Sequence, residues 1–223
     1  EHGNEYLSRK YPAFEPKYGV SRLGVDDPRF STEPSSDGTF RMVSCSHVVP
    51  VKRLGLLVRG LAELGRLRPE QTFEWVHIGD GPERGTIEKQ AMSTLPENVR
   101  PAFLGQIPHE EVMEFYCRHC VDLFLNVSES EGIPVTIMEA QSCGIPVLAT
   151  AVGGTPEIVT EKVGLLLGPD PHPGDIAGAI GTFVDDPAGT ERMRRQSRAN
   201  WEENYNAEKN FREFARQLEA IVS

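Results

Sequence analysis

Short apolar runs alternate along this chain with longer amphipathic segments. The runs have the length and composition of buried strands, and they lie at residues 40–47, 73–78, 99–104, 123–127, 146–150 and 163–167. Between the first two runs, Leu54, Leu57, Leu61 and Leu64 are spaced for one face of a helix over residues 53–67. Alternation of this kind predicts an α/β fold, with a parallel sheet that carries helices on both faces.

The two ends of the chain differ from this pattern. Residues 1–38 contain Pro12, Pro16, Pro28 and Pro34, hold few apolar clusters and end in a turn-rich stretch. We therefore predict a linker-like segment at 1–38, an α/β domain at 39–205 and a C-terminal helix at 206–223. Further helices are predicted over residues 108–119, 191–205 and 207–222. The apolar face of the last one is expected to be partly exposed and to favour association; it holds Phe211, Phe214, Leu218 and Ile221.

Composition narrows the function classes. The 223 residues are 39% hydrophobic and 25% charged, enough for a sizeable core, and the formal net charge is −10. Nucleic-acid binding is disfavoured because phosphate backbones are held by basic surfaces. No apolar run approaches the ~18 residues of a membrane span, and the first ten residues lack a signal-peptide core. We expect a cytoplasmic protein.

The four cysteines do not predict a disulfide framework or a metal site. Cys117 and Cys120 form a CxxC, but it falls late in a predicted helix instead of opening one, and no second pair supplies further ligands. We expect reduced thiols in and near a helix.

A glycine turn after the second run raises the alternative of dinucleotide binding. Gly79 and Gly81 follow that run, but the third glycine of the fingerprint should stand where Arg84 does, and Gly85 comes one place late. No acidic residue follows the next run to hold an adenosine ribose. We interpret the segment mainly as a tight turn, and a nicotinamide oxidoreductase remains a disfavoured alternative.

The most informative segment follows the fourth apolar run. A polar loop through Glu131 and Gly132 leads to Pro134, a residue suited to the start of a helix. Backbone amides at a helix start favour an anion such as a diphosphate, and glycine allows close approach. Glu131 and Glu139 are separated by seven residues, and each carboxylate can accept bonds from paired hydroxyls. One could hold a sugar and the other a ribose.

This segment resembles the Glu-(seven residues)-Glu signature of retaining glycosyltransferases of family four, whose GT-B fold has two Rossmann-like domains. The likeness continues with the family's spacing through Ala140, Gly144-Ile145-Pro146-Val147, Gly153-Gly154 and Glu157. It implies that the chain is the C-terminal, donor-binding half of such an enzyme. Residues 1–38 would then be a remnant of the N-terminal domain and the linker, with residues 20–25 resembling the segment that leads from one domain to the other. Two glutamates at this distance alone would carry no weight, because they could equally cap a helix and line its solvated face.

The resemblance implies roles for individual residues. Glu139 would hold the ribose and Glu131 the hydroxyls of the donor sugar. The diphosphate would lie against Lys52 and the backbone of Gly132, Ile133, Pro134 and Val135. Glu131 and Lys52 are the predicted catalytic residues.

Two further loops would complete the site. Ser46 and His47 stand where the family has glycine and arginine, and Arg53 replaces a common glycine. Arg53 or protonated His47 would then supply the missing phosphate contact. After the third run, Gln106 and Ile107 are assigned to the nucleobase, with ordinary turn packing as the alternative. Gly153 and Gly154 either approach a ligand or make a turn.

The resemblance implies transfer of a hexosyl-type sugar from a nucleotide-diphosphate sugar, with retention of configuration and without a metal or other cofactor. The acceptor, a saccharide or lipid-linked molecule as in polysaccharide biosynthesis, would bind the N-terminal domain of the same enzyme. That domain would also provide any peripheral contact with the inner membrane. The isolated chain is expected to bind donor weakly and to transfer little. The alternative is a noncatalytic module that binds a nucleotide or nucleotide sugar.

Overall fold

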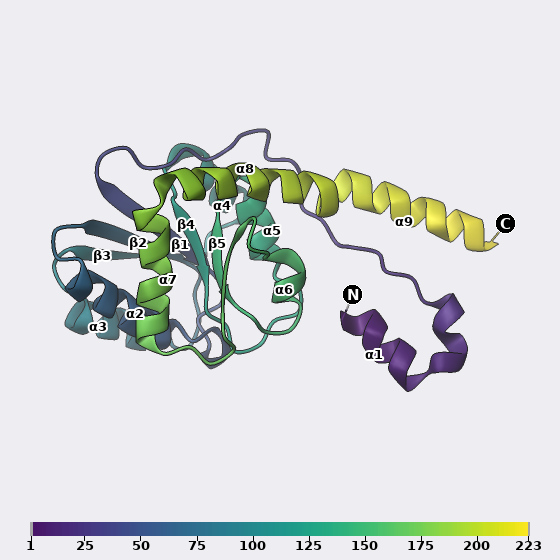
Figure 1. The fold of residues 1–223 in the computed structure, drawn as a ribbon, viewed down its shortest axis with the longest axis horizontal. Coiled ribbons are helices and arrows are strands. Elements are labelled where there is room, and N and C mark those ends of the chain that lie inside the picture. Colours follow the sequence, from purple (N-terminus) through teal and green to yellow (C-terminus); the bar gives the residue numbers. More distant parts are fainter. Residues whose placement is uncertain (1, 223) are drawn as a thin grey trace.

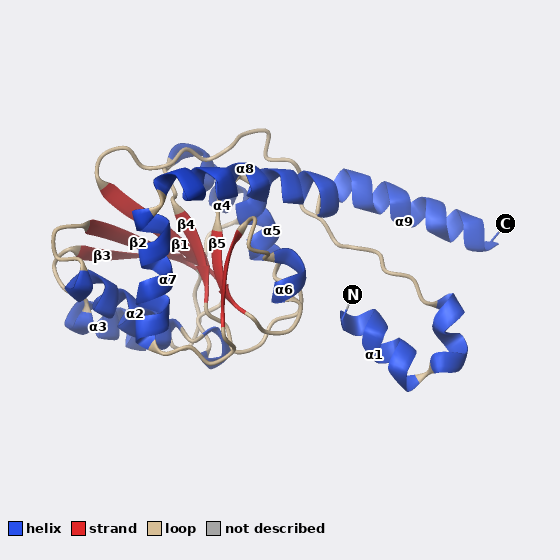
Figure 2. Ribbon diagram, in the orientation of Figure 1, coloured by secondary structure: helices blue, strands red, loops and turns tan. Residues whose placement is uncertain are grey.

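All six predicted runs form strands of one parallel sheet in the computed structural model, which describes residues 2–222 (Figures 1 and 2). Within these residues the strand order is β3-β2-β1-β4-β5-β6, and every pair of neighbours is parallel. The strands are β1 (Thr39–Cys45), β2 (Thr72–Ile78), β3 (Val99–Gly105), β4 (Leu123–Asn126), β5 (Val147–Thr150) and β6 (Gly164–Leu167). The predicted fold class is confirmed.

Helices cover both faces of the sheet (Figure 1). Those that pack on the domain are α2 (Leu54–Leu67), α3 (Arg84–Thr94), α4 (His109–Arg118), α5 (Val135–Ser142), α6 (Thr155–Ile158), α7 (Pro173–Asp185) and α8 (Pro187–Asn204). Helices α2, α3 and α7 share one hydrophobic core with the sheet, whereas α4, α5, α6 and α8 share another. The leucine face of α2 lies in the first core, where each fully buried leucine contributes about 2 kcal/mol.

The sequence did not predict α7. Its segment contains Gly174, Gly178 and Gly181, which lower helix propensity. Tertiary packing overrides that preference: a Cβ added at Gly60 of α2 would lie 2.7 Å from Ile176 of α7, so the two helices approach closely. A capping box formed by His172 and Asp175 begins α7.

The N-terminal segment contains structure that its proline content did not predict. Helix α1 (His2–Lys10) and the 3-10 turn η1 (Pro12–Lys17) lie apart from the sheet (Figure 1). From Val25 onward the segment is attached to the domain, because Val25 exchanges backbone hydrogen bonds with Tyr205 and Ala207. The domain boundaries at residues 38 and 205 stay predictions.

Helix α9 (Ala207–Val222) leaves the domain at the end of α8 and projects away from it (Figure 1). Its bounds agree with the prediction. Phe211, Phe214 and Leu218 are 52%, 44% and 48% exposed, while the side chain of Ile221 lies outside the described residues. Association through this face stays a prediction. None of the helices within residues 2–222 combines the length and the apolar character that crossing a bilayer requires.

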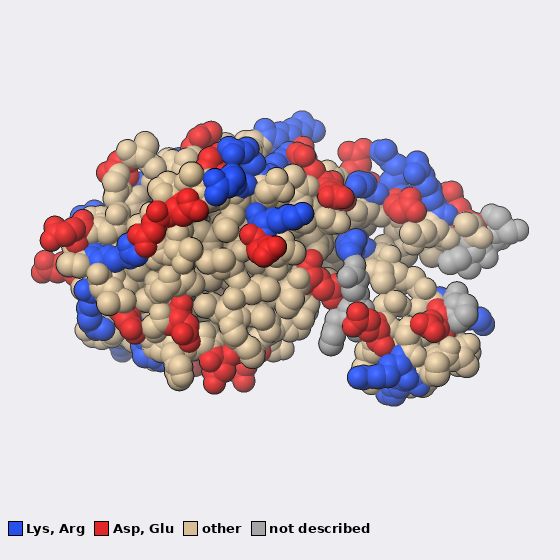
Figure 3. Space-filling view, viewed as in Figure 1, with Lys and Arg blue, Asp and Glu red and all other residues tan. Residues whose placement is uncertain are grey.

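The surface charges and the cysteines can be compared with the predictions made from the sequence. Acidic and basic side chains are interspersed on the face shown in Figure 3, without a continuous basic surface. Cys117 lies in the last turn of α4 and Cys120 just beyond its end, as predicted, and all four cysteines are free.

The strand order reverses between β1 and β4, which lie side by side near the middle of the sheet. The connection from β1 runs toward β2 on one side, and that from β4 runs toward β5 on the other. Ligands of open parallel sheets bind at such a switch point, outside the carboxyl ends of the strands. The fold therefore brings the loops after β1 and β4 together.

Candidate functional site

The loop after β4 presents Glu131 at the switch point. Asn126, the last residue of β4, accepts a hydrogen bond from the Ser128 amide at 3.1 Å and donates one to Glu131 Oε1 at 3.1 Å. The loop thus turns sharply, and the Glu131 side chain is only 9% exposed. A polar residue at the end of an apolar run was the available signal for Asn126, which the sequence analysis did not assign to the site.

Lys52 reaches the same carboxylate from the loop after β1. It ends the 3-10 turn η2 (Pro50–Lys52), and its Nζ lies 2.6 Å from Glu131 Oε1. Burial by itself raises the pKa of Glu131, but hydrogen bonds from Lys52, Ser128 and Asn126 outweigh burial and hold the pKa below its ordinary value. The structure therefore joins the two predicted catalytic residues as an ionised pair.

Glu139 lies on α5, with its side chain only 10% exposed. His109, the first residue of α4, places Nε2 3.1 Å from Glu139 Oε1. Burial raises the pKa of Glu139 above its ordinary value, and the contact with His109 opposes that shift without cancelling it. The two glutamates consequently have pKa shifts of opposite sign. His109 directly follows the Gln106–Pro108 turn, but its contact depends on how α4 packs beside α5, which the sequence does not reveal.

The other predicted site residues surround these glutamates at the carboxyl edge. Pro134 is the N-cap of α5, and the first amides of that helix have no partner within it. Gly132 and Val135 are exposed, and Ile133 is half-buried. A Cβ added at Gly132 would meet no atom within 4 Å, so the space beside this residue is open at the helix start, where backbone amides favour an anion.

His47 and Gln106 are exposed on the neighbouring loops after β1 and β3. Ile107 is half-buried and packs on the core beneath α4 and α5. Nothing in these positions assigns a ligand, so their roles stay predictions.

Arg53, in the loop after β1, forms hydrogen bonds to the loops after β4 and β6. Its Nε donates to the Val127 carbonyl at 2.8 Å, and its Nη2 donates to the carbonyls of Ser128 at 3.0 Å and Pro169 at 2.9 Å. The residue has a left-handed backbone, with φ 49°, and α2 begins one residue later than predicted. This conformation explains why glycine is common here in the family that the sequence resembles. The phosphate contact stays a prediction, and the structure gives Arg53 a role in positioning the Glu131 loop.

The two glycine turns contact protein backbone. At Gly153, φ is 52°, and an added Cβ would lie 1.8 Å from the Glu131 carbonyl oxygen; the Gly154 amide donates to the Gly132 carbonyl at 2.9 Å. The pair therefore supports the Glu131 loop. An added Cβ at Gly79 would similarly lie 1.9 Å from the Ser46 carbonyl oxygen. The tight turn predicted there is closed by the Arg84 amide, which donates to the Gly81 carbonyl at 3.1 Å.

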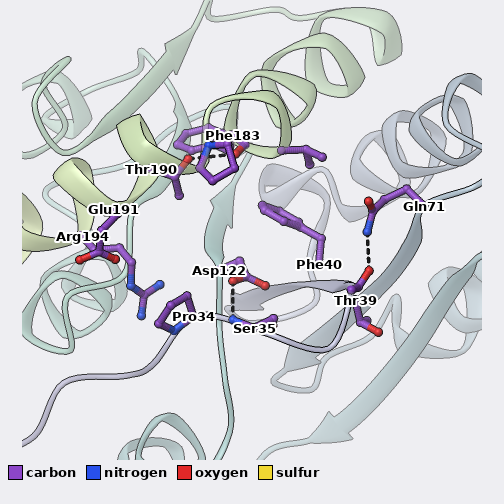
Figure 4. Close-up of a pocket in the computed structure, with 13 residues that line it drawn as sticks. Pro34, Ser35, Thr39, Phe40, Gln71, Asp122, Phe183, Thr190, Glu191 and Arg194 are labelled. Carbon is purple, nitrogen blue, oxygen red and sulfur yellow. Dashed lines mark hydrogen bonds between the residues drawn. The ribbon is translucent and has the colours of Figure 1, made fainter.

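A cavity lies at the edge of the sheet opposite to this site, where the strands begin (Figure 4). It has a volume of about 400 Å³ and is lined by the start of β1, the end of α7 and the start of α8. Figure 4 shows Phe40 and Phe183 on its apolar side and Arg194 near its rim. The polar groups there are occupied by the protein: Asp122 accepts the amides of Ser35 and Arg41, and Arg194 donates to backbone carbonyls. The cavity lacks the convergent acceptors of the carboxyl edge.

Residues 27–206 match the family described as "Glycosyl transferases group 1". The GDP-mannose-dependent alpha-(1-6)-phosphatidylinositol monomannoside mannosyltransferase of Mycolicibacterium smegmatis is 30% identical over 220 residues, covering 87% of this chain and 56% of that protein. A phosphatidylinositol N-acetylglucosaminyltransferase subunit from Arabidopsis thaliana is 35% identical over 151 residues, covering 67% and 32%. The chain thus spans about a third to just over half of these relatives.

Solved structures share the fold. Anabaena HepE, in complex with UDP and glucose, has a TM-score of 0.76 at 22% identity, covering 92% of this chain and 57% of that one. A glycosyltransferase from Rickettsia africae has a TM-score of 0.81 at 17% identity, covering 98% and 61%. These similarities confirm the Rossmann-like half of a GT-B fold.

Two substitutions of Arg53 should distinguish the effect of its carbonyl contacts on stability from the effect of its left-handed backbone. Arg53→Gly and Arg53→Ala both remove the carbonyl contacts, and Arg53→Ala, which keeps the Cβ of the wild type, should lower the free energy of unfolding by about 2 kcal/mol. The glycine variant should lose about 1 kcal/mol less, because it also relieves the strain of a Cβ at positive φ. Urea denaturation measures both. Equal stabilities of the two variants would contradict the backbone strain at positive φ. Wild-type stability in both would contradict a stabilising role for the carbonyl contacts.

The raised pKa of Glu139 predicts a pH-dependent stability difference. A carboxyl whose folded pKa lies above its unfolded value favours folding when protonated, and this contribution is lost as pH rises between the two values. Glu139→Gln has no such loss, so its stability relative to wild type should increase from acid to neutral pH and then level off. Urea denaturation across this range measures the difference. A difference that is constant or shrinks with rising pH would contradict the shift.

Proposed function

Because the chain belongs to the group 1 glycosyl transferases, we propose that it is the donor-binding domain of a retaining enzyme of glycosyltransferase family four. The observation that carries this proposal is the juxtaposition of Lys52, Glu131 and Glu139 around the start of α5 at the switch point. These residues come from separate parts of the chain, and they match a site for an anion flanked by hydroxyl groups.

The donor is a nucleoside diphosphate sugar. Its diphosphate would lie against the first amides of α5 and Lys52, its ribose against Glu139 and its hexose hydroxyls against Glu131. This donor class is supported by two similar proteins, a mannosyltransferase named as GDP-mannose-dependent and a structure bound to UDP and glucose. The names differ in the base, so the proposal extends to the diphosphate sugar and not to its nucleobase.

Transfer begins with departure of the sugar from the diphosphate, which leaves negative charge on the phosphate oxygens. Lys52 and the α5 amides are fixed donors near that position and would stabilise the developing charge. Glu131 accepts hydrogen bonds from the sugar and is held ionised by its partners. We propose that these groups suffice without a divalent metal. The acceptor oxygen attacks the same face of the sugar, assisted by the departing phosphate, and configuration is retained.

The acceptor would bind the part of the enzyme that lies beyond this chain. This chain is similar to a mannosyltransferase and to an N-acetylglucosaminyltransferase subunit, and both are named for phosphatidylinositol-based acceptors. These names favour a lipid-linked or saccharide acceptor. Any peripheral contact with the inner membrane would then belong to that part as well. The chain alone is expected to bind donor but to transfer little.

The proposal is tested by separating donor binding from transfer. Calorimetric titration of this chain with UDP, GDP, UDP-glucose and GDP-mannose should give binding to one base. Glu139→Gln should weaken that binding by at least about tenfold, since two hydroxyl bonds to a charged acceptor are lost. Glu161→Gln, an exposed glutamate outside the site, is the matched control. Equal affinity in Glu139→Gln and wild type would contradict the ribose assignment.

Glu131→Gln in the full-length enzyme tests catalysis. It should retain nucleotide affinity within about threefold but reduce transfer by at least about a hundredfold, because the sugar loses its charged acceptor. Transfer at the wild-type rate would contradict the role of Glu131. A full-length wild type that binds donor and transfers nothing would instead support a noncatalytic binding module. Transfer that requires a divalent metal, measured with a chelator present, would contradict the metal-free mechanism.

A further inference from the structure

The contact between His109 and Glu139 is not explained by the proposed roles of the site. His109 begins α4, immediately after the loop that leaves β3, and its side chain is 62% exposed. Glu139 lies on α5 and is only 10% exposed. An exposed imidazole therefore covers one oxygen of a nearly buried carboxylate, at the place where the ribose is proposed to bind.

The other titratable groups around Glu139 do not offset its charge. Burial raises the pKa of Cys45 on β1 and of Cys143, at the end of α5, to about 12 each. Burial also raises the pKa of Tyr116 on α4, whose hydroxyl has no hydrogen-bond partner among the described residues. All three are neutral near neutral pH, and the charge of Glu139 adds to each of these shifts. His109 is the group whose contact lowers the pKa of Glu139 against the effect of burial.

We propose that His109 is a positioning residue for the donor nucleotide, which keeps Glu139 ionised and holds one of its oxygens in place for the ribose hydroxyls. The inference rests on the proposed function, since it requires Glu139 to accept the ribose.

The chemistry of the two partners explains the need for such a residue. An ionised carboxylate accepts through both oxygens, so it can hold two neighbouring hydroxyls at once, whereas a protonated one carries a donor on one oxygen. Nε2 of His109, when it carries hydrogen, donates to Oε1 and leaves that oxygen a second acceptor position for a hydroxyl. Because the imidazole is exposed, it can adjust when the nucleotide enters without disturbing the core.

The sign of the pH dependence follows. Without His109, the buried carboxyl has lost the contact that lowers its pKa, so that pKa rises further and a larger fraction of Glu139 is protonated in mildly acid solution. Nucleotide affinity should then fall as pH decreases. With His109 present, its contact opposes the rise in the pKa of Glu139, so affinity should depend less on pH.

The test is calorimetric titration with UDP and with GDP at about pH 6 and about pH 8, using wild type, His109→Ala, His109→Gln and His119→Ala. His119 is the matched control, because it is an exposed histidine just after α4 whose ring stacks on Phe115. Every variant is compared with wild type at the same pH, so titration of the nucleotide itself cancels. His109→Ala should bind about tenfold more weakly at the lower pH and about threefold or less at the higher one. His109→Gln, which keeps a hydrogen-bond donor at this position, should recover part of the affinity that His109→Ala loses.

A second readout needs no ligand. The side-chain carboxyl carbon of Glu139, followed by NMR with carbon-13 labelling, should titrate at higher pH in His109→Ala than in wild type and should be unchanged in His119→Ala. An unchanged titration, or an affinity loss equal at both pH values, would overturn the inference.

These outcomes are distinguishable from failure of the proposed function. Wild type that binds neither UDP nor GDP, or Glu139→Gln that binds as well as wild type, would refute the donor site itself. Binding that depends on Glu139 and is insensitive to His109 would refute only the positioning role.

Discussion

The pairing of β1 with β4 is the constraint on which the rest of this structure depends. The two strands lie side by side although they are separated along the chain by α2, β2, α3, β3 and α4. Their connections leave in opposite directions, so a space opens at their carboxyl ends. Lys52 and Glu131 meet there at 2.6 Å, and Arg53 ties the two loops to each other and to the loop after β6. Loss of this pairing would separate Lys52 from Glu131 and Arg53 from the loop after β4.

The two glutamates are almost equally buried, with side chains 9% and 10% exposed, and it is their hydrogen-bond partners that distinguish them. Glu131 is ionised by a lysine and two polar neighbours, an arrangement that resists protonation while a leaving group departs. Glu139 is buried against neutral thiols and a phenol, with His109 as its compensating contact. A buried carboxylate of this kind is unfavourable for folding, and such groups are concentrated at functional sites. Ligand binding gives a reason for its presence that packing does not.

The sequence predicted the parts of the fold that depend on local pattern. Apolar runs bounded by turns identified the strands, and leucine spacing identified α2. Helix α7 was missed because its glycines lower local propensity, while the close packing of Ile176 that Gly60 of α2 permits is a tertiary effect. From the sequence, Arg53 is predicted to begin a helix, whereas the structure shows that its backbone is left-handed. Site contacts that cross elements, such as that of His109, were likewise invisible.

The carboxyl edge of the sheet brings the side chains of Lys52 and Glu131 together, whereas Asp122 and Arg194 at the amino edge are bonded to backbone groups. The most direct measurement is therefore amide NMR of this chain during titration with UDP and with GDP. The account predicts shifts concentrated in residues 44–53, 105–109 and 131–136, at the carboxyl edge. Shifts concentrated instead in residues 34–40 and 183–194, around the cavity at the amino edge, with the carboxyl edge unchanged, would contradict it.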